Sequence, residues 1–182
     1  MSKILVDTID TRSGTSTLTL GSSNAGTIAL GSGDVQSNFM YPAFKVKLAS
    51  NQSIPNSTTT KIAFDTEIYD TDNAYASNKF TVPTGKGGKY HFSGLIVIRN
   101  IDDNEQASVR IHVNGSDTVS GLNVYRMTQY GTGSDTFITV PISVDINLSA
   151  TDYVELFIFH SEGSAQNVDS GYSHFEGFRI GT

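Results

Sequence analysis

The chain has 182 residues, of which 37% are hydrophobic, and this size fits one ordinary domain with an appendage. It contains no cysteine, so disulfides and thiolate metal sites are excluded. The formal net charge is −6, and the 12 Lys and Arg residues are scattered along the chain. A nucleic-acid-binding protein needs a basic stripe, so we expect no nucleic-acid partner.

The N-terminus carries little apolar sequence. Its only apolar run there is Ile4-Leu-Val6. A signal peptide needs a longer run, and a membrane-spanning helix needs about 20 apolar residues. We therefore expect neither an export signal nor insertion into a membrane.

Residues 1–38 differ from the rest of the chain in composition. They hold no aromatic residue and are rich in Gly, Ser and Thr. A pattern occurs twice with a spacing of ten residues, in Leu18-Thr-Leu-Gly-Ser22 and Ile28-Ala-Leu-Gly-Ser32, and turn-forming residues close each copy. One chain cannot bury enough apolar surface in such short segments, so the pattern predicts a β-rich stem formed by three chains together. A flexible Gly/Ser linker is the alternative.

From residue 40 onward, apolar and polar residues alternate with a period of two, which is typical of β-strands. Phe44-Lys-Val-Lys-Leu48 comes first, and Ile62, Phe64, Thr66 and Ile68 then share one face of the next expected strand. Further strands are expected near residues 78–82, 89–98, 107–113, 121–129, 136–144, 153–160 and 174–180. Asn114-Gly115 predicts a two-residue hairpin turn, because both residues tolerate positive φ angles. This series of short strands predicts an all-β sandwich or barrel.

Two of these expected strands are apolar on both faces. Leu95 and Val97 occupy the second face of residues 89–98, and Phe157 and Phe159 occupy the second face of residues 153–160. A strand of an antiparallel sandwich needs only one apolar face. We therefore predict that Leu95, Val97, Phe157 and Phe159 lie at an interface between copies of the chain.

Several motifs in residues 43–182 carry a family resemblance. They are Phe64 with Asp70 and Tyr75, Phe80-Thr-Val-Pro83 followed by Gly88-Lys-Tyr-His-Phe-Ser93, Val113-Asn-Gly115, Asp152-Tyr-Val-Glu-Leu156 and His174-Phe-Glu-Gly-Phe178. In these motifs the chain resembles the globular head of complement component one, subcomponent q, and its tumour-necrosis-factor-like relatives. The resemblance implies a ten-stranded antiparallel jelly roll in residues 39–182, which trimerises, binds ligands through loops and performs no catalysis. Altered spacing around Lys86-Gly87 implies changed loops on the same fold.

A second resemblance lies in the N-terminal segment. Ile4-Leu-Val-Asp-Thr-Ile-Asp-Thr11 and the two Leu-Gly-Ser repeats are similar to the starts of tail-fibre and other virion proteins of tailed bacteriophages. The resemblance implies a virion location for the protein. It also implies that the stem attaches the head to the particle, and the candidate attachment residues are Leu18, Leu20, Ile28 and Leu30.

The sequence contains no recognisable catalytic site. The Gly-x-Ser-x-Gly of serine hydrolases is absent, and His174-Phe-Glu176 lacks the cysteines that would complete a zinc deaminase site. Gly85-Lys-Gly-Gly-Lys89 lacks the spacing of a phosphate loop and is interpreted as a turn. Acidic residues leave calcium binding open beside ordinary solvated turns. These acidic residues form two groups, one with Asp65, Asp70 and Asp72 and one with Asp102, Asp103 and Glu105.

These observations favour a non-enzymatic, trimeric virion structural protein, either a short tail fibre or a spike with a host-recognition head. A capsid decoration protein at three-fold positions is the alternative, and a glycan-active enzyme has no motif in its favour. We expect loops of the head to bind a host glycan or protein. The candidate residues are Tyr125, Arg126, Gln129 and Tyr130, which combine aromatic faces with hydrogen-bonding groups.

Overall fold

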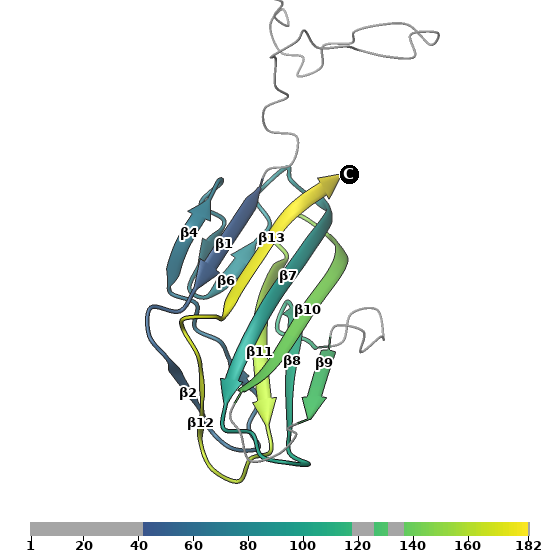
Figure 1. Ribbon diagram of the computed structural model, residues 1–182. Coiled ribbons are helices and arrows are strands. Elements are labelled where there is room, and N and C mark those ends of the chain that lie inside the picture. The colour runs from purple at the N-terminus through teal and green to yellow at the C-terminus, as the bar shows by residue number, and fades with distance from the viewer. Residues whose placement is uncertain (1–41, 118–125, 131–136, 182) are drawn as a thin grey trace, which may run out of the picture. The chain divides into compact units, whose positions relative to one another are not determined.

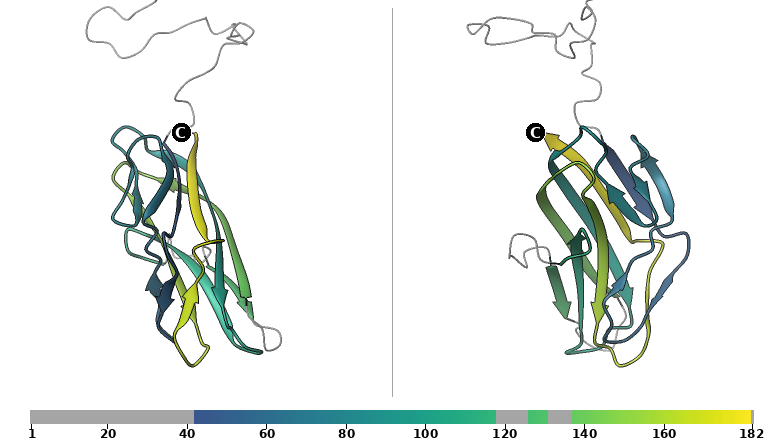
Figure 2. Two further views of the ribbon diagram at one scale, coloured as in Figure 1. Left: turned by 60° about the vertical axis from the view of Figure 1, so that its left-hand side comes forward. Right: turned by 180° about the vertical axis from the view of Figure 1, so that it is seen from behind.

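The structure, a computed structural model, describes residues 42–117, 126–130 and 137–181, and for residues 126–130 it describes the backbone alone. All of these residues belong to one compact unit, Asn38–Thr182. They contain no helix that is long and apolar enough to cross a membrane. They form two antiparallel sheets that face each other (Figures 1 and 2).

Sheet A contains seven of the described strands, and β7 lies at its centre with β13 on one side and β10 on the other. β10 pairs with β7 along twelve residues, from Phe137 opposite Arg99 to Leu148 opposite Gly88. The strands of this sheet are β1 (Ala43–Lys47), β2 (Gln52–Ile54), β4 (Thr66–Asp70), β7 (Gly88–Arg99), β10 (Phe137–Leu148), β12 (Gln166–Val168) and β13 (His174–Gly181).

Sheet B contains the other six described strands, and β11 lies between β6 and β8. β9 extends the sheet beyond β8, and the short β3 also pairs with β11. The strands of this sheet are β3 (Thr60–Lys61), β5 (Tyr75–Ala76), β6 (Lys79–Thr81), β8 (Gln106–Val113), β9 (Arg126–Tyr130) and β11 (Tyr153–His160). The expected all-β fold is therefore confirmed, with thirteen strands in the described residues where ten were predicted.

The prediction of one strand over residues 62–68 is wrong, because the chain crosses from one sheet to the other within this segment. β3 ends at Lys61 in sheet B, and β4 begins at Thr66 in sheet A. Ile62 and Phe64 are buried in the crossing segment, whereas Ile68 is 54% exposed. The crossing resets the period-two pattern, so Ile68 does not share a face with Ile62 and Phe64.

Aromatic rings from both sheets fill the centre of the core. Phe44 of β1 lies 4.9 Å from Phe80 and 5.1 Å from Tyr75 between ring centroids, in stacked geometries. Its ring meets that of Phe175 edge-on at 5.2 Å. These residues are nearly all fully buried, and burial of such side chains contributes about 1.5–3 kcal/mol each. The alternating pattern therefore places its apolar side chains between the two sheets, as expected.

The turn after β8 has the predicted geometry. Asn114 and Gly115 have φ angles of 54° and 79°, and Val113 and Ser116 exchange two backbone hydrogen bonds of 2.9 and 3.0 Å. The segment after Pro83 also forms a turn, in which the Lys86 amide donates to the Pro83 carbonyl at 3.0 Å. This confirms the interpretation of the glycine-rich segment as a turn that leads into β7.

Candidate functional site

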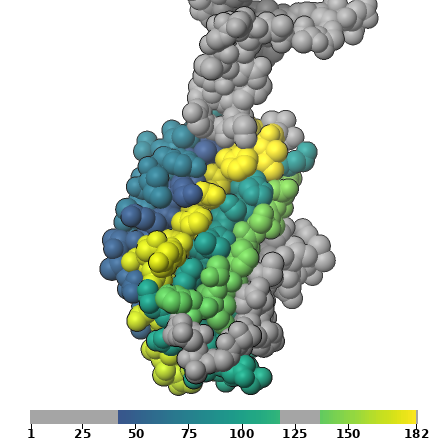
Figure 3. All heavy atoms as spheres, in the orientation of Figure 1, coloured from purple at the N-terminus to yellow at the C-terminus, as the bar shows by residue number. Residues whose placement is uncertain are grey.

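Apolar side chains gather on the outer face of sheet A, and two of them are largely exposed among the described residues. Leu95 and Val97 of β7 line a cavity of about 340 Å³ together with Phe137, Thr139 and Tyr172. Phe137 is 49% exposed and Tyr172 is 62% exposed. We call this group the apolar face of sheet A. Figure 3 shows the side of the molecule on which it lies, where β13, β7 and β10 run as yellow, teal and green diagonal bands.

A buried carboxylate holds the loop that carries Tyr172. Asp169 is 4% exposed and accepts a hydrogen bond of 2.6 Å from the Arg99 Nε. Its other oxygen accepts from the Gly171 amide at 2.7 Å, and its carbonyl accepts from the Ser173 amide at 3.0 Å. The Ser173 hydroxyl in turn accepts from the Val97 amide of β7 at 3.0 Å. These bonds fix the loop against β7, so the apolar face exists before any partner binds.

The outer face of sheet B is covered by side chains of the same sheet. The Phe157 ring stacks on the His112 ring, with 3.9 Å between centroids. The guanidinium of Arg110 lies 5.7 Å from the centre of the Phe159 ring. Burial lowers the pKa of His112, while the nearby Asp117 and Glu155 act in the opposite direction. Phe157 and Phe159 are half-buried in this layer, which leaves less free apolar surface than on sheet A.

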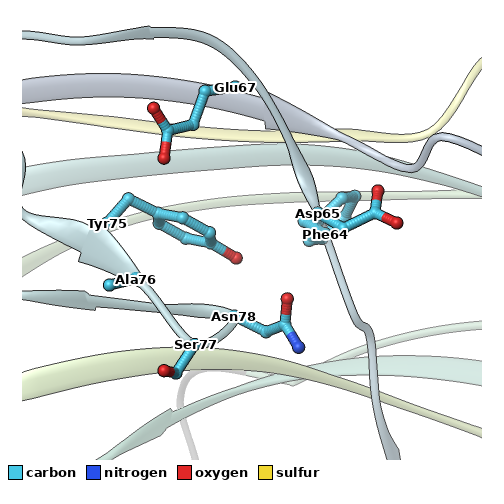
Figure 4. Close-up of a pocket in the computed structure, with 7 residues that line it drawn as sticks. All are labelled: Phe64, Asp65, Glu67, Tyr75, Ala76, Ser77 and Asn78. Carbon is cyan, nitrogen blue, oxygen red and sulfur yellow. The ribbon is translucent and has the colours of Figure 1, made fainter.

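A polar pocket of about 260 Å³ lies between β4 and the β5–β6 hairpin. Phe64 and Asp65 line one side, Glu67 lines another, and Tyr75, Ser77 and Asn78 complete it (Figure 4). The Tyr75 hydroxyl points into this space, although its side chain is only 6% exposed. Burial, reinforced by Glu155, Asp65 and Glu67, raises the pKa of Tyr75 well above its ordinary value, so the hydroxyl stays protonated.

Comparisons with known proteins identify the fold. No protein-family model and no curated protein matches the chain. The globular domain of zebrafish complement 1qA matches with a TM-score of 0.55 and 20% identity, over 76% of this chain and 97% of that one. Murine APRIL matches with a TM-score of 0.56 and 10% identity, over 76% and 98% of the two chains. Eiger, a tumour-necrosis-factor protein of S. frugiperda, matches with a TM-score of 0.53 and 11% identity, over 76% and 90%.

The fold is the jelly roll of complement heads and tumour-necrosis factors. This confirms the first resemblance as far as the fold is concerned. The similarity to tailed-phage proteins rests on the sequence alone.

The jelly roll separates the four predicted interface residues into two pairs. Leu95 and Val97 lie on the outer face of sheet A, whereas Phe157 and Phe159 lie on the outer face of sheet B. The two pairs therefore do not form one continuous patch. Their roles at an interface stay predictions.

Three of the predicted recognition residues lie in a strand and not in a loop, so that part of the prediction is wrong. Arg126, Gln129 and Tyr130 belong to β9, whose backbone pairs with β8. The strand forms because this segment continues the hydrogen-bonded ladder of sheet B. Tyr125 and the four candidate attachment residues lie outside the described residues. The latter are Leu18, Leu20, Ile28 and Leu30.

Two of the acidic residues considered for calcium accept hydrogen bonds from backbone amides of the chain. Asp70 accepts from the Tyr75 amide at 2.7 Å, and Asp65 accepts from the Ala49 amide at 2.7 Å. In the second group, the Glu105 carboxylate accepts a hydrogen bond from the Ser161 hydroxyl. No group of three His, Asp or Glu side chains suited to a metal ion occurs in the described residues. The structure therefore provides no argument for a calcium site in that part of the chain.

Sequence reasoning missed the polar pocket. Its residues come from β4 and from the turn between β5 and β6, and no motif joins these two segments. The one available signal was Ser77-Asn78, a pair of residues common in turns. In the structure both have positive φ angles, 53° and 59°.

Proposed function

We propose that the protein is a non-enzymatic binding and assembly module that works as a homotrimer through the apolar face of sheet A. The observation that carries this proposal is the exposure of Phe137 and Tyr172 beside Leu95 and Val97. Apolar residues that gather on one face of a folded domain are typical of a contact with another protein. The number of chains in the assembly is taken from the family resemblance in the sequence, which implies a trimer. The jelly-roll fold agrees with that resemblance.

The ordered state of this face supports a stable contact. The loop with Tyr172 is already fixed by Asp169, and the Arg99 guanidinium lies 4.6 Å from the centre of the Phe137 ring. A surface that is rigid before binding loses little side-chain entropy in the complex. Burial of a large apolar side chain contributes about 1.5–3 kcal/mol, so a few such residues from each chain are enough for lasting association.

A finer proposal concerns the setting in which the trimer acts. We propose a bacteriophage virion, with residues 1–38 as the attachment stem and the jelly roll as the host-recognition head of a short tail fibre or spike. The support for this setting is the sequence similarity of Ile4–Thr11 and of the Leu-Gly-Ser repeats to virion proteins. A decoration protein on the capsid remains the alternative. Both versions need a trimer that binds other proteins and performs no chemical step.

Light scattering on the full-length protein tests the assembly. The expected mass is three times the chain mass of 19.6 kDa. Leu95→Glu and Phe137→Glu should each yield monomers, because a carboxylate would lie unpaired in a desolvated contact at a cost of several kcal/mol. Phe137 is half-exposed in the single chain, so its replacement should leave the fold intact.

Phe157→Glu provides the matched comparison on sheet B. If this variant alone dissociates the trimer, the contact lies on the outer face of sheet B and the proposed face is wrong. A monomeric wild-type protein would contradict the trimer altogether.

A further inference from the structure

A pair formed by a histidine and an aspartate lies on the outer face of sheet A, beyond the apolar residues described above. His91 and Leu95 both face away from the core, because they are four residues apart in β7 and side chains alternate along a strand. His91 lies opposite Asp145 of β10, and its Nδ1 atom is 2.7 Å from the Asp145 Oδ1 atom. Both strands cross the side of the molecule shown in Figure 3. The pair and the apolar face of sheet A therefore belong to one surface.

A trimer contact of ordinary size covers this pair. Four residues of a strand separate His91 from Leu95, which corresponds to a distance of about 14 Å. A stable protein contact buries about 800 Å² on each partner, and a patch of that area is about 30 Å across. A contact centred on Leu95 therefore extends over His91 and Asp145. Phe178 of β13 lies on the opposite side of His91, with 5.3 Å between ring centroids, and gives the pair an apolar neighbour there.

In the single chain the pair is open to water. The His91 side chain is 29% exposed, and the Asp145 side chain is 69% exposed. An exposed ion pair contributes little to stability, because water and salt screen both charges. A second chain on this face would remove that water, and the net charge of the pair would then affect the free energy of association.

The net charge of the pair depends on the protonation of His91. A histidine changes its charge between pH 5 and pH 8, whereas an aspartate does not. The neutral ring still donates a hydrogen from Nδ1 to Asp145, so the hydrogen bond exists in both states. The pair is neutral when the ring is protonated, and it carries one negative charge when the ring is not. Because burial of an unbalanced carboxylate is costly, the contact favours the protonated pair.

The other charged groups around His91 keep their charge over this pH range. Lys89 lies two residues away on the same face of β7, and a lysine is cationic throughout the range. On β13, Glu176 pairs with Lys45 of β1 at 2.8 Å. Burial acts to raise the pKa of Glu176, but its hydrogen bonds and the Lys45 charge outweigh burial and lower it, so this carboxylate stays ionised. These groups therefore add a constant charge to the face.

We propose that the His91–Asp145 pair is a pH-sensitive part of the trimer contact, so that the chains associate more tightly at acidic than at alkaline pH. This inference rests on the trimer proposed above. Assembly takes up protons at the pair, and linkage then makes association stronger as pH falls. Since every chain of the trimer contributes one pair, the dissociation constant should fall about tenfold or more between pH 8 and pH 6.

Sedimentation equilibrium of the full-length protein at pH 6 and at pH 8, at one ionic strength, tests the proposal. His91→Gln keeps a hydrogen-bonding amide beside Asp145 and should lose most of the pH dependence. Asp145→Asn should reverse it, because the pair is then neutral at pH 8 and positive at pH 6. If dilution does not dissociate the trimer, a fixed sub-denaturing concentration of urea brings dissociation into range.

His174→Gln is the matched control, because it removes the other histidine of this face, whose Nδ1 atom lies 3.3 Å from the Tyr172 carbonyl oxygen. This variant should keep the pH dependence of the wild type. Melting temperatures show that the variants are folded.

The outcomes separate this proposal from the trimer itself. A wild-type trimer that dissociates equally at both pH values would overturn the proposal and leave the trimer intact. Unchanged pH dependence in His91→Gln, or its loss in His174→Gln, would overturn it in the same way. A monomer at both pH values would contradict the trimer and this proposal together.

Discussion

Gly177 shows how a single residue without a side chain makes room for the aromatic core. It lies in β13 between the rings of Phe92 and Phe44. A Cβ atom at this position would lie 2.6 Å from Phe92 Cδ1 and 2.9 Å from Phe44 Cε1. Both distances are shorter than van der Waals contact, and both rings are themselves fully buried. The packing of the two rings therefore requires glycine here.

We predict that Gly177→Ala lowers the free energy of unfolding by about 1–3 kcal/mol, because the added methyl group overpacks the core. The lower backbone entropy of the unfolded alanine variant opposes this effect by only about 0.4–1 kcal/mol. Urea denaturation measures the difference. Gly181→Ala is the control, because a Cβ atom there would meet nothing within 4 Å. Equal stability of both variants would show that the two rings move aside freely.

β8 and β11 show how a pair of strands covers its own outer face. His112 of β8 stacks on Phe157 of β11, and the His112 Nε2 atom is buried without a hydrogen-bond partner in the structure. Asp117, Glu155 and Arg110 are the charged groups that act on this imidazole, in addition to its burial. Because burial is the largest effect, the folded chain favours the neutral ring.

This stack makes stability depend on pH. Since the pKa of His112 in the folded chain lies below its unfolded value of 6.5, its stabilising contribution is complete above pH 6.5 and is lost as pH falls through the folded pKa. Between about pH 7 and pH 5, the wild type should therefore lose more stability than His112→Gln. Urea denaturation of both proteins at the two pH values measures this. An equal loss of stability in the wild type and in His112→Gln would mean that His112 has the same pKa in the folded and unfolded chains.

The whole molecule combines a jelly roll with an N-terminal segment of different composition. The jelly roll holds the aromatic core, whereas residues 1–38 contain no aromatic residue. A head with its own core needs no contribution from the stem to fold. The proposed assembly and attachment functions can therefore be separated by truncation.

We predict that residues 39–182 alone fold and form trimers but no longer attach to the virion. Light scattering and thermal denaturation test the head, and electron microscopy of labelled particles tests attachment. Replacing Leu18, Leu20, Ile28 and Leu30 by serine in the full chain is the matched variant, and it should also lose attachment. If residues 39–182 fail to fold, the boundary is wrong. Label on the capsid of complete particles would favour the decoration protein over the tail fibre.

Much of the fold could be predicted because its signals are local. The period-two pattern of β7, β8 and β11 depends only on which side each residue faces, and Asn114-Gly115 depends only on backbone torsion. The crossing between β3 and β4 could not be predicted, because it follows from which neighbour each strand pairs with. That choice left Ile68 exposed.

The candidate sites also divide into features that the local sequence determines and features that depend on tertiary structure. The sequence by itself determined that the chain is an all-β protein without cysteine and with apolar residues on both faces of two strands, since composition and alternation are properties of neighbours in the chain. Only the tertiary structure decided which second face is left more open. His112 stacks on Phe157, whereas Phe137 and Tyr172 stay 49% and 62% exposed among the described residues. It also decided that Glu67, Tyr75 and Asn78 share a pocket. Such groups form when strands from two sheets meet, and local sequence patterns do not encode that meeting.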